Sequence, residues 1–336
     1  MKNIQTSKFD IASWILIGVA MVLVLKLNLL PALLAGLLVF ELIHMLTPRI
    51  ARKFPGNRAK LIAIAFLAIV IVGLLSLAGA GLVAFFRSES GSLTVLLAKM
   101  AQIIEDSRKI LPTWILDRLP ADAITFKEEA AIWLRTHADE LQVVGKEAGR
   151  ASAHVLIGMI IGGMVALREV IIDEHYKPFA RAMAQRAHLF GDAFRRIVFA
   201  QVRIAAINAF FTGIYLAIIL PLLGVHLPLV KTLIALTFVV GLIPVLGNLI
   251  SNTVIVIVSL SQSLTVAIGS LAYLIIIHKF EYFLNARIVG GQIRANAWEL
   301  LIAMLLMESA FGLAGIVAAP IYYAYIKSEL RARDLV

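Results

Sequence analysis

The sequence predicts an all-α polytopic membrane protein with about six full spans, two re-entrant helical hairpins in an inverted arrangement and a small extracytoplasmic helical insert. Hydrophobic residues make up 61% of the chain and charged residues 15%, against about 45–50% and about 25% in soluble domains. The apolar residues form blocks of about 15–26, long enough to cross a hydrocarbon layer of about 30 Å. The excess of basic residues, a net charge of +10, lies mainly in the segments between these blocks, as in cytoplasmic loops.

Residues 1–60 predict a two-span hairpin followed by a basic cytoplasmic loop. The spans are Ile11–Leu25 and Pro31–Leu46, and no small-residue cleavage site follows the first, so we expect it to be retained. The segment Thr47–Lys60 contains arginines and lysines but no acid, which is the strongest cytoplasmic signal in the chain. Residues 61–86 then predict the third span.

Residues 87–152 predict a helical domain outside the cytoplasm, because acids and bases nearly balance there and three spans precede it. Residues 153–203 predict the fourth span, His154–Leu167, and a cytoplasmic amphipathic helix. The spacing of Gly158, Gly162 and Gly163 within that span predicts a close contact with another helix.

Residues 204–328 predict a core that begins with a fifth span, Ile204–Leu223. Two apolar arms follow, 229–243 and 249–262, separated by the Pro/Gly-containing tip Gly241–Asn248. Each arm has about 14–15 residues, hence about 21–22 Å of helix, which is short for a full crossing. We therefore predict a hairpin that enters the membrane from outside and turns back.

A sixth span, Leu264–Phe283, returns the chain to the cytoplasm. A second pair of short arms, 298–310 and 316–326, is interrupted at Phe311–Gly315, and the basic segment 327–334 leads into the tail 329–336. This tail stays cytoplasmic only if the second pair also turns back, so the two hairpins enter from opposite sides. Inverted repeats with broken helices are a recurring design of transporters.

Two motifs carry a family resemblance. The first is an Ile-Pro-x-x-Gly tip containing Pro244 and Gly247, and the second is a Gly-x-x-Gly segment, Gly312 and Gly315, followed by Pro320 in Ala-x-Pro. With their flanking segments, these motifs resemble the autoinducer-2 exporter family of permeases over most of the chain. The resemblance implies a permease that moves a small solute.

The chain departs from the family pattern at several positions. Ala200 stands where the family has the Gly of a Gly-Gln pair, and Ala286 replaces the Pro before an arginine. Ala297-Trp298 replaces a further proline, and Glu308-Ser309 replaces a Gly-Gly pair. These changes leave the fold expectation intact but do not allow a substrate to be carried over.

The candidate substrate or ion path consists of polar and glycine residues at the two tips and on the fifth span. Gln201 and Asn208 are seven residues apart and so share a helix face, and free polar groups of broken helices bind ions and solutes. Simple capping by Asn248, or amide contacts between helices, explain the same residues structurally. The full set is Gln201, Asn208, Gly241, Pro244, Gly247, Asn248, Asn252, Glu308, Gly312 and Gly315.

Glu308 is the candidate coupling carboxylate because an acid at membrane depth costs about 2.5–3.5 kcal/mol and usually faces a cavity or a partner. The alternative is a cytoplasmic ion pair or gate with Arg287 or Arg294. Glu41 and His44 have the spacing of half a metal site, but no second pair exists, so they are interpreted as a polar helix contact.

The functional prediction is a secondary transporter of a small polar or anionic solute in the bacterial inner membrane, coupled to H⁺ or Na⁺, with both termini cytoplasmic. The alternatives are a channel-like pore, or a scaffold whose extracytoplasmic domain binds an envelope partner. The chain has no cysteine and no nucleotide-binding or hydrolase motif, so neither an enzyme nor a cofactor is expected. The expected partners are the lipid bilayer, the solute and further copies of the chain, and not nucleic acid.

Overall fold

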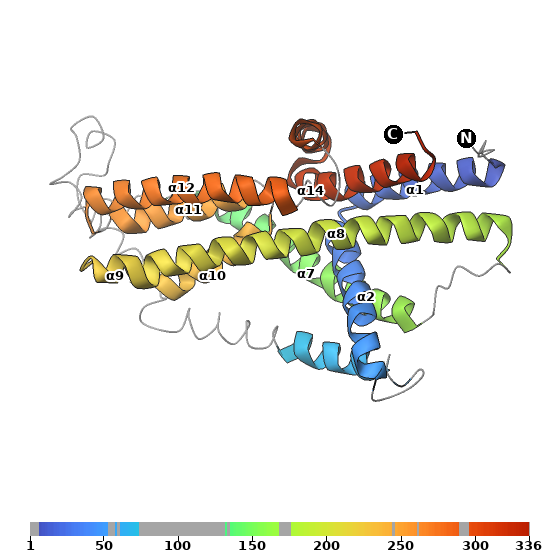
Figure 1. The fold of residues 1–336 in the computed structure, drawn as a ribbon, viewed down its shortest axis with the longest axis horizontal. Helices are drawn as coiled ribbons and strands as arrows, with labels where there is room; N and C mark the ends of the chain where they lie inside the picture. The colour runs from blue at the N-terminus through green and yellow to red at the C-terminus, as the bar shows by residue number, and fades with distance from the viewer. Residues whose placement is uncertain are drawn as a thin grey trace. The chain divides into compact units, whose positions relative to one another are not determined.

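The computed structural model describes residues 7–52, 58, 61–73, 132, 135–167, 176–243, 246–260, 262–288 and 296–335. These residues form helices, with no strand in the described ranges (Figure 1). Within these ranges, five helices are long and apolar enough to cross a membrane, and the prediction of an all-α polytopic protein is confirmed at this level. Most of the predicted domain 87–152 lies outside the described residues.

The chain divides into two compact units, each considered by itself. Unit 1 comprises Met1–Ile71, Lys146–Ala200 and Ala286–Val336, and unit 2 comprises Val72–Gly145 and Gln201–Asn285.

In unit 1, α1 (Lys8–Lys26) and α2 (Leu30–Ala51) form the predicted helical hairpin. Ser7 caps α1, since its hydroxyl accepts from a backbone N–H and the Asp10 carboxylate accepts from the Ser7 N–H. Asn28, at φ 56°, turns the chain between the two helices. Asparagine tolerates this left-handed conformation better than most residues do.

The helix α7 (Ala138–Leu167) approaches α2 closely within unit 1, as the glycine spacing predicts. A Cβ atom added to Gly158 would overlap the backbone of Ala32, and one added to Gly162 would overlap that of Gly36. Small residues on both helices therefore let the two backbones meet. The start of α7 at Ala138 means that this helix runs without a break through the predicted domain boundary at 152–153.

The predicted amphipathic helix and fifth span are a single helix, α8 (Pro178–Ile214). It continues through a π-helical turn, Tyr215–Ile219, into the short α9 (Leu220–Leu222). Pro221 in α9 has no N–H and its ring crowds the preceding turn. The wider turn, in which the Leu220 N–H bonds to the Tyr215 carbonyl, accommodates this proline.

In unit 2, α10 (Val230–Gly241) and α11 (Leu246–Leu260) are the two arms of the first predicted hairpin, and they pack against each other. The break between them falls within the predicted tip. The helix α12 (Leu264–Ile288) follows and begins in the same unit. Its buried Leu274 packs in one core cluster with Tyr215 and with Ile255 of α11.

The last helix of unit 1, α14 (Ala297–Ala332), breaks where the second hairpin was predicted. Gly312 has φ 60° and ψ −143°, a conformation open essentially to glycine alone. A Cβ at Gly315 would overlap the carbonyl of Met307, so the chain folds back tightly at this point. The break is confirmed, whereas its re-entrant placement in a membrane stays a prediction.

Candidate functional site

The candidate site in unit 2 is a row of polar side chains on α8 that faces the hairpin α10–α11. The Gln201 amide nitrogen donates to the carbonyl oxygen of Gly241, the last residue of α10, over 2.7 Å. Seven residues further along α8, the Asn208 amide nitrogen donates to the Asn248 side-chain oxygen, also over 2.7 Å. The two amides predicted to share a face thus bind the two sides of the hairpin tip.

A third helix joins this network through His278 of α12. The Asn248 amide nitrogen lies 3.2 Å from His278 Nδ1, which accepts the hydrogen bond in the tautomer protonated at Nε2. Asn208, Asn248 and His278 therefore form one hydrogen-bonded chain across three helices. A simple N-cap would not produce this chain, because here the Asn248 side chain binds groups on other helices.

Beyond the end of α8, the row continues with hydroxyl groups from the π-helical turn, α11 and α12. The Tyr215 hydroxyl lies 2.9 Å from the Ser270 hydroxyl, which in turn lies 2.8 Å from that of Ser259. Tyr215 also stacks on Tyr273, with ring centroids 4.1 Å apart. We call this set the polar row, and its members are Gln201, Asn208, Tyr215, Asn248, Ser259, Ser270 and His278.

Thr212 lies on α8 between two members of the polar row. The side chain is fully buried, and its hydroxyl has no hydrogen-bond partner among the described residues. A buried hydroxyl without a partner costs about 1–3 kcal/mol. A hydroxyl that can still form a hydrogen bond therefore lies beside the polar row.

Small residues bring the hairpin against α8. An added Cβ at Gly241 would lie 3.3 Å from the Cβ of Ala205, which sits on α8 between Gln201 and Asn208. A Cβ at Gly247 would overlap the carbonyl of Val240 in the opposite arm. Gly247 is therefore required for the close packing of the two arms, and Gly241 leaves little free space against Ala205.

The remaining predicted residues fall in different places. Asn252 is half-buried one turn beyond Asn248, and Pro244 lies outside the described residues. Glu308 belongs to the first arm of α14 in unit 1, where it is exposed and has no ion pair within the described ranges. Arg294 is outside those ranges, and nothing is described of the Arg287 side chain.

Sequence reasoning missed Tyr215, His278 and the two serines of the row. The interval of seven that relates Gln201 to Asn208 continues to Tyr215, so helical spacing alone could have placed Tyr215 on the same face. His278 had none, because only the packing of α12 against α11 brings it to Asn248.

The polar row offers amide, hydroxyl and imidazole groups with no formal charge when His278 is neutral. Such groups supply donors and acceptors to a solute that leaves water, without fixing the sign of its charge. No cluster of three or more metal-ligating side chains occurs in the described part of the chain.

A separate group of charged residues joins the two ends of the chain in unit 1. Buried Arg186 of α8 lies 3.0 Å from Asp10 and 3.2 Å from Glu329, and Arg333 lies 2.9 Å from Asp10. We call Asp10, Arg186, Glu329 and Arg333 the terminal charge cluster. Because Asp10 opens α1 and Glu329 lies near the end of α14, both helix ends are on the same side of unit 1.

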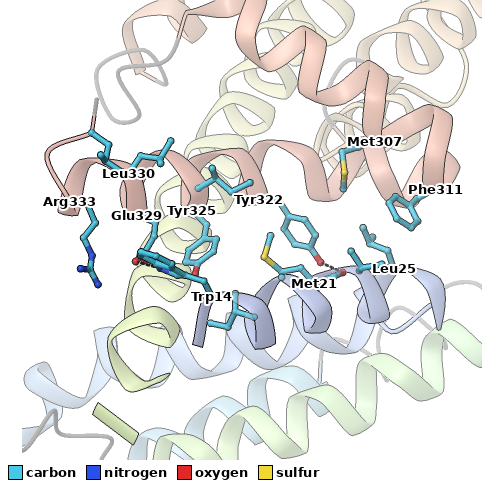
Figure 2. A pocket seen from close by; sticks show the side chains of 15 residues that line it. Trp14, Met21, Leu25, Met307, Phe311, Tyr322, Tyr325, Glu329, Leu330 and Arg333 are labelled. Atoms are coloured by element: carbon cyan, nitrogen blue, oxygen red, sulfur yellow. Dashed lines mark hydrogen bonds between the residues drawn. The ribbon is translucent and has the colours of Figure 1, made fainter. Parts of the chain in front are cut away.

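A cavity of about 480 Å³ extends from this cluster between α1 and α14. Figure 2 shows Trp14 donating to Glu329 at one end, and the Tyr322 hydroxyl bonded to the backbone oxygen of Met21 further along. Apart from Glu329 and Arg333, its walls are mainly apolar and aromatic. These contacts hold the two helices together along most of α1.

The long apolar helices of the described residues are those of a multi-pass α-helical membrane protein. The chain belongs to the AI-2E family of transporters, whose sequence profile matches residues 11–332. This assignment confirms the family resemblance over nearly the whole chain, and the family is one of transporters rather than enzymes. No curated protein and no solved structure matches the chain.

Proposed function

We propose that this protein is a secondary transporter that moves a small polar or anionic solute across the bacterial inner membrane, with its polar row as part of the path. The observation that carries the proposal is the hydrogen-bonded chain Asn208–Asn248–His278. Burying such polar groups in a predicted membrane core costs free energy. We therefore expect them where they form hydrogen bonds to a solute that has left water.

In this mechanism the two hairpins act as gates. The tip of the α10–α11 hairpin is bonded to α8 through the side chains of Gln201 and Asn208. A solute that offers its own donors and acceptors can exchange with these bonds, and the tip then separates from α8. The break at Gly312 in α14 gives the second gate a hinge of its own.

The terminal charge cluster supports the proposed orientation. It brings the start of α1 and the end of α14 together, so both termini lie on one side, and the basic loop after α2 favours the cytoplasmic side for them. Coupling to H⁺ or Na⁺ through Glu308 and assembly into a homo-oligomer remain parts of the proposal.

The test is to replace the two amides and follow solute release. Asn208→Leu and Asn248→Leu keep the branched shape of the side chain, and each removes the Asn208–Asn248 hydrogen bond, while Thr253→Ala removes an exposed hydroxyl of α11 that bonds only within its own helix. We expect untargeted mass spectrometry of the medium of overexpressing cells to show a solute whose release falls at least tenfold in both Asn variants but not in Thr253→Ala. Equal release by all variants would refute the proposed path.

A further inference from the structure

A second cavity, of about 840 Å³, lies within unit 1 between α2, α7 and α8. Its size is within the range of about 300–1,000 Å³ typical of sites for small organic ligands. Most of the wall is apolar or glycine, but α2 contributes Glu41 and His44, and α8 contributes His188, Asp192 and Arg195. His154 of α7 also lines the cavity and bonds to the backbone oxygen of Asn28 over 3.1 Å.

Glu41 is the unusual member of this wall. It is 7% exposed, and its carboxylate accepts no hydrogen bond from any residue in the described ranges. The nearest cationic atom is Arg195 Nε at 4.0 Å, whereas the same guanidinium lies 3.0 Å from Asp192. Arg195 is therefore paired mainly with Asp192, and the negative charge of Glu41 has no cation in close contact.

The backbone of α8 makes room for this carboxylate. A Cβ at Gly191 would lie 3.4 Å from Glu41 Oε1, so the acid sits directly against the glycine with no side chain between them. A buried acid without donors is costly unless a partner satisfies it, and an ionisable residue within a predicted span points to a functional site.

The charges in the wall define the missing partner. Glu41 and Asp192 are two anions against the single cation Arg195, which leaves one negative charge when the three histidines are neutral. We propose that the cavity binds an organic monocation, with an ammonium group at Glu41 and an apolar body along the wall. A bare metal ion fits less well, because the described residues contain no group of three ligating side chains.

This inference is independent of the proposed transport path, because the cavity belongs to unit 1 and the polar row to unit 2. An acyl chain of the bilayer is the other occupant that an apolar wall would accept. The two occupants differ in one respect: only the organic cation needs the charge of Glu41.

The test is calorimetric titration of the full chain in nanodiscs of phosphatidylcholine at pH 7. The probes are 3-phenylpropylammonium and its neutral analogue 3-phenylpropanol. We expect the ammonium compound to bind at least tenfold more tightly than the alcohol, and Glu41→Gln to remove this difference. Glu147→Gln, which changes a carboxylate on α7 that is 60% exposed, should leave both affinities unchanged.

Arg195→Gln provides a second test in the opposite direction, because it removes the cation that competes for Glu41. We expect it to tighten binding of the ammonium compound at least threefold, which keeps the proposal testable should Glu41→Gln fail to fold. Equal affinities for the two probes, an unchanged Glu41→Gln variant or no gain in Arg195→Gln would overturn the proposal. If Glu147→Gln weakened binding of the ammonium compound as much as Glu41→Gln does, the proposal would also be overturned, because binding would then reflect non-specific attraction to surface charge.

Discussion

The terminal charge cluster gives the most direct prediction about stability, because Arg186 is fully buried between two carboxylates. Asp10 keeps a second cation, Arg333 at 2.9 Å, if Arg186 is replaced by methionine. Glu329 keeps only the indole N–H of Trp14 at 2.6 Å, and its other oxygen has no partner in the described part of the chain. Arg186→Met therefore leaves Glu329 with a buried negative charge and no cation to pair with it.

Removing one member of a buried ion pair costs about 3–5 kcal/mol. With about 2 °C per kcal/mol for a large domain, Arg186→Met should lower the melting temperature by about 6–10 °C. Tryptophan fluorescence in detergent measures this change, and Arg150→Met, at a side chain of α7 that is 55% exposed and lies 4.0 Å from the exposed Glu147, is the matched control with a shift of about 2 °C or less.

A double variant distinguishes two causes of the lost stability, the unpaired charge of Glu329 and the loss of packing around Arg186. Arg186→Met combined with Glu329→Gln removes both charges, so at least half of the loss should be recovered. A melting temperature unchanged by Arg186→Met would refute the reasoning. So would a double variant as unstable as the sum of the two single variants, since Glu329 would then not be the cause.

Two further predictions concern α14. Gly312→Ala places a side chain at φ 60° and ψ −143° and should cost about 1–3 kcal/mol, seen as a lower melting temperature, whereas Gly18→Ala, in an open part of α1, should cost nothing or stabilise the protein. Glu308→Gln should abolish solute movement driven by an ion gradient while leaving downhill movement intact in the same vesicles. Full gradient-driven transport by this variant would exclude Glu308 as the coupling group.

The helices and their breaks could be predicted from the sequence, because apolar blocks and Pro/Gly tips act locally. The break at Gly312 and the close approach of Gly158 and Gly162 to α2 follow from such signals. The continuity of α8 could not be read this way. Arg203 marks a change in composition, but an exposed arginine does not interrupt a helix, and no proline occurs between Pro178 and Pro221.

The candidate site was predicted in part for the same reason. Helical spacing placed Gln201 and Asn208 on one face, and the tip signal identified Asn248. His278 is 30 residues from Asn248, and its role depends on how α12 packs, which no local pattern encodes. Glu41 was interpreted as a helix contact because the sequence does not show that its carboxylate lacks a donor.

The central claim is that the tip of the α10–α11 hairpin faces a water-filled path. The native chain has no cysteine, so Asn248→Cys and Leu249→Cys each introduce one thiol. Leu249 is 66% exposed on the neighbouring position of α11 and is expected to face lipid. A membrane-impermeant maleimide should label Asn248→Cys in both right-side-out and inside-out vesicles and should label Leu249→Cys in neither. An Asn248→Cys protein that stays unlabelled from both sides would contradict the account, because the tip would then be packed core rather than part of a path.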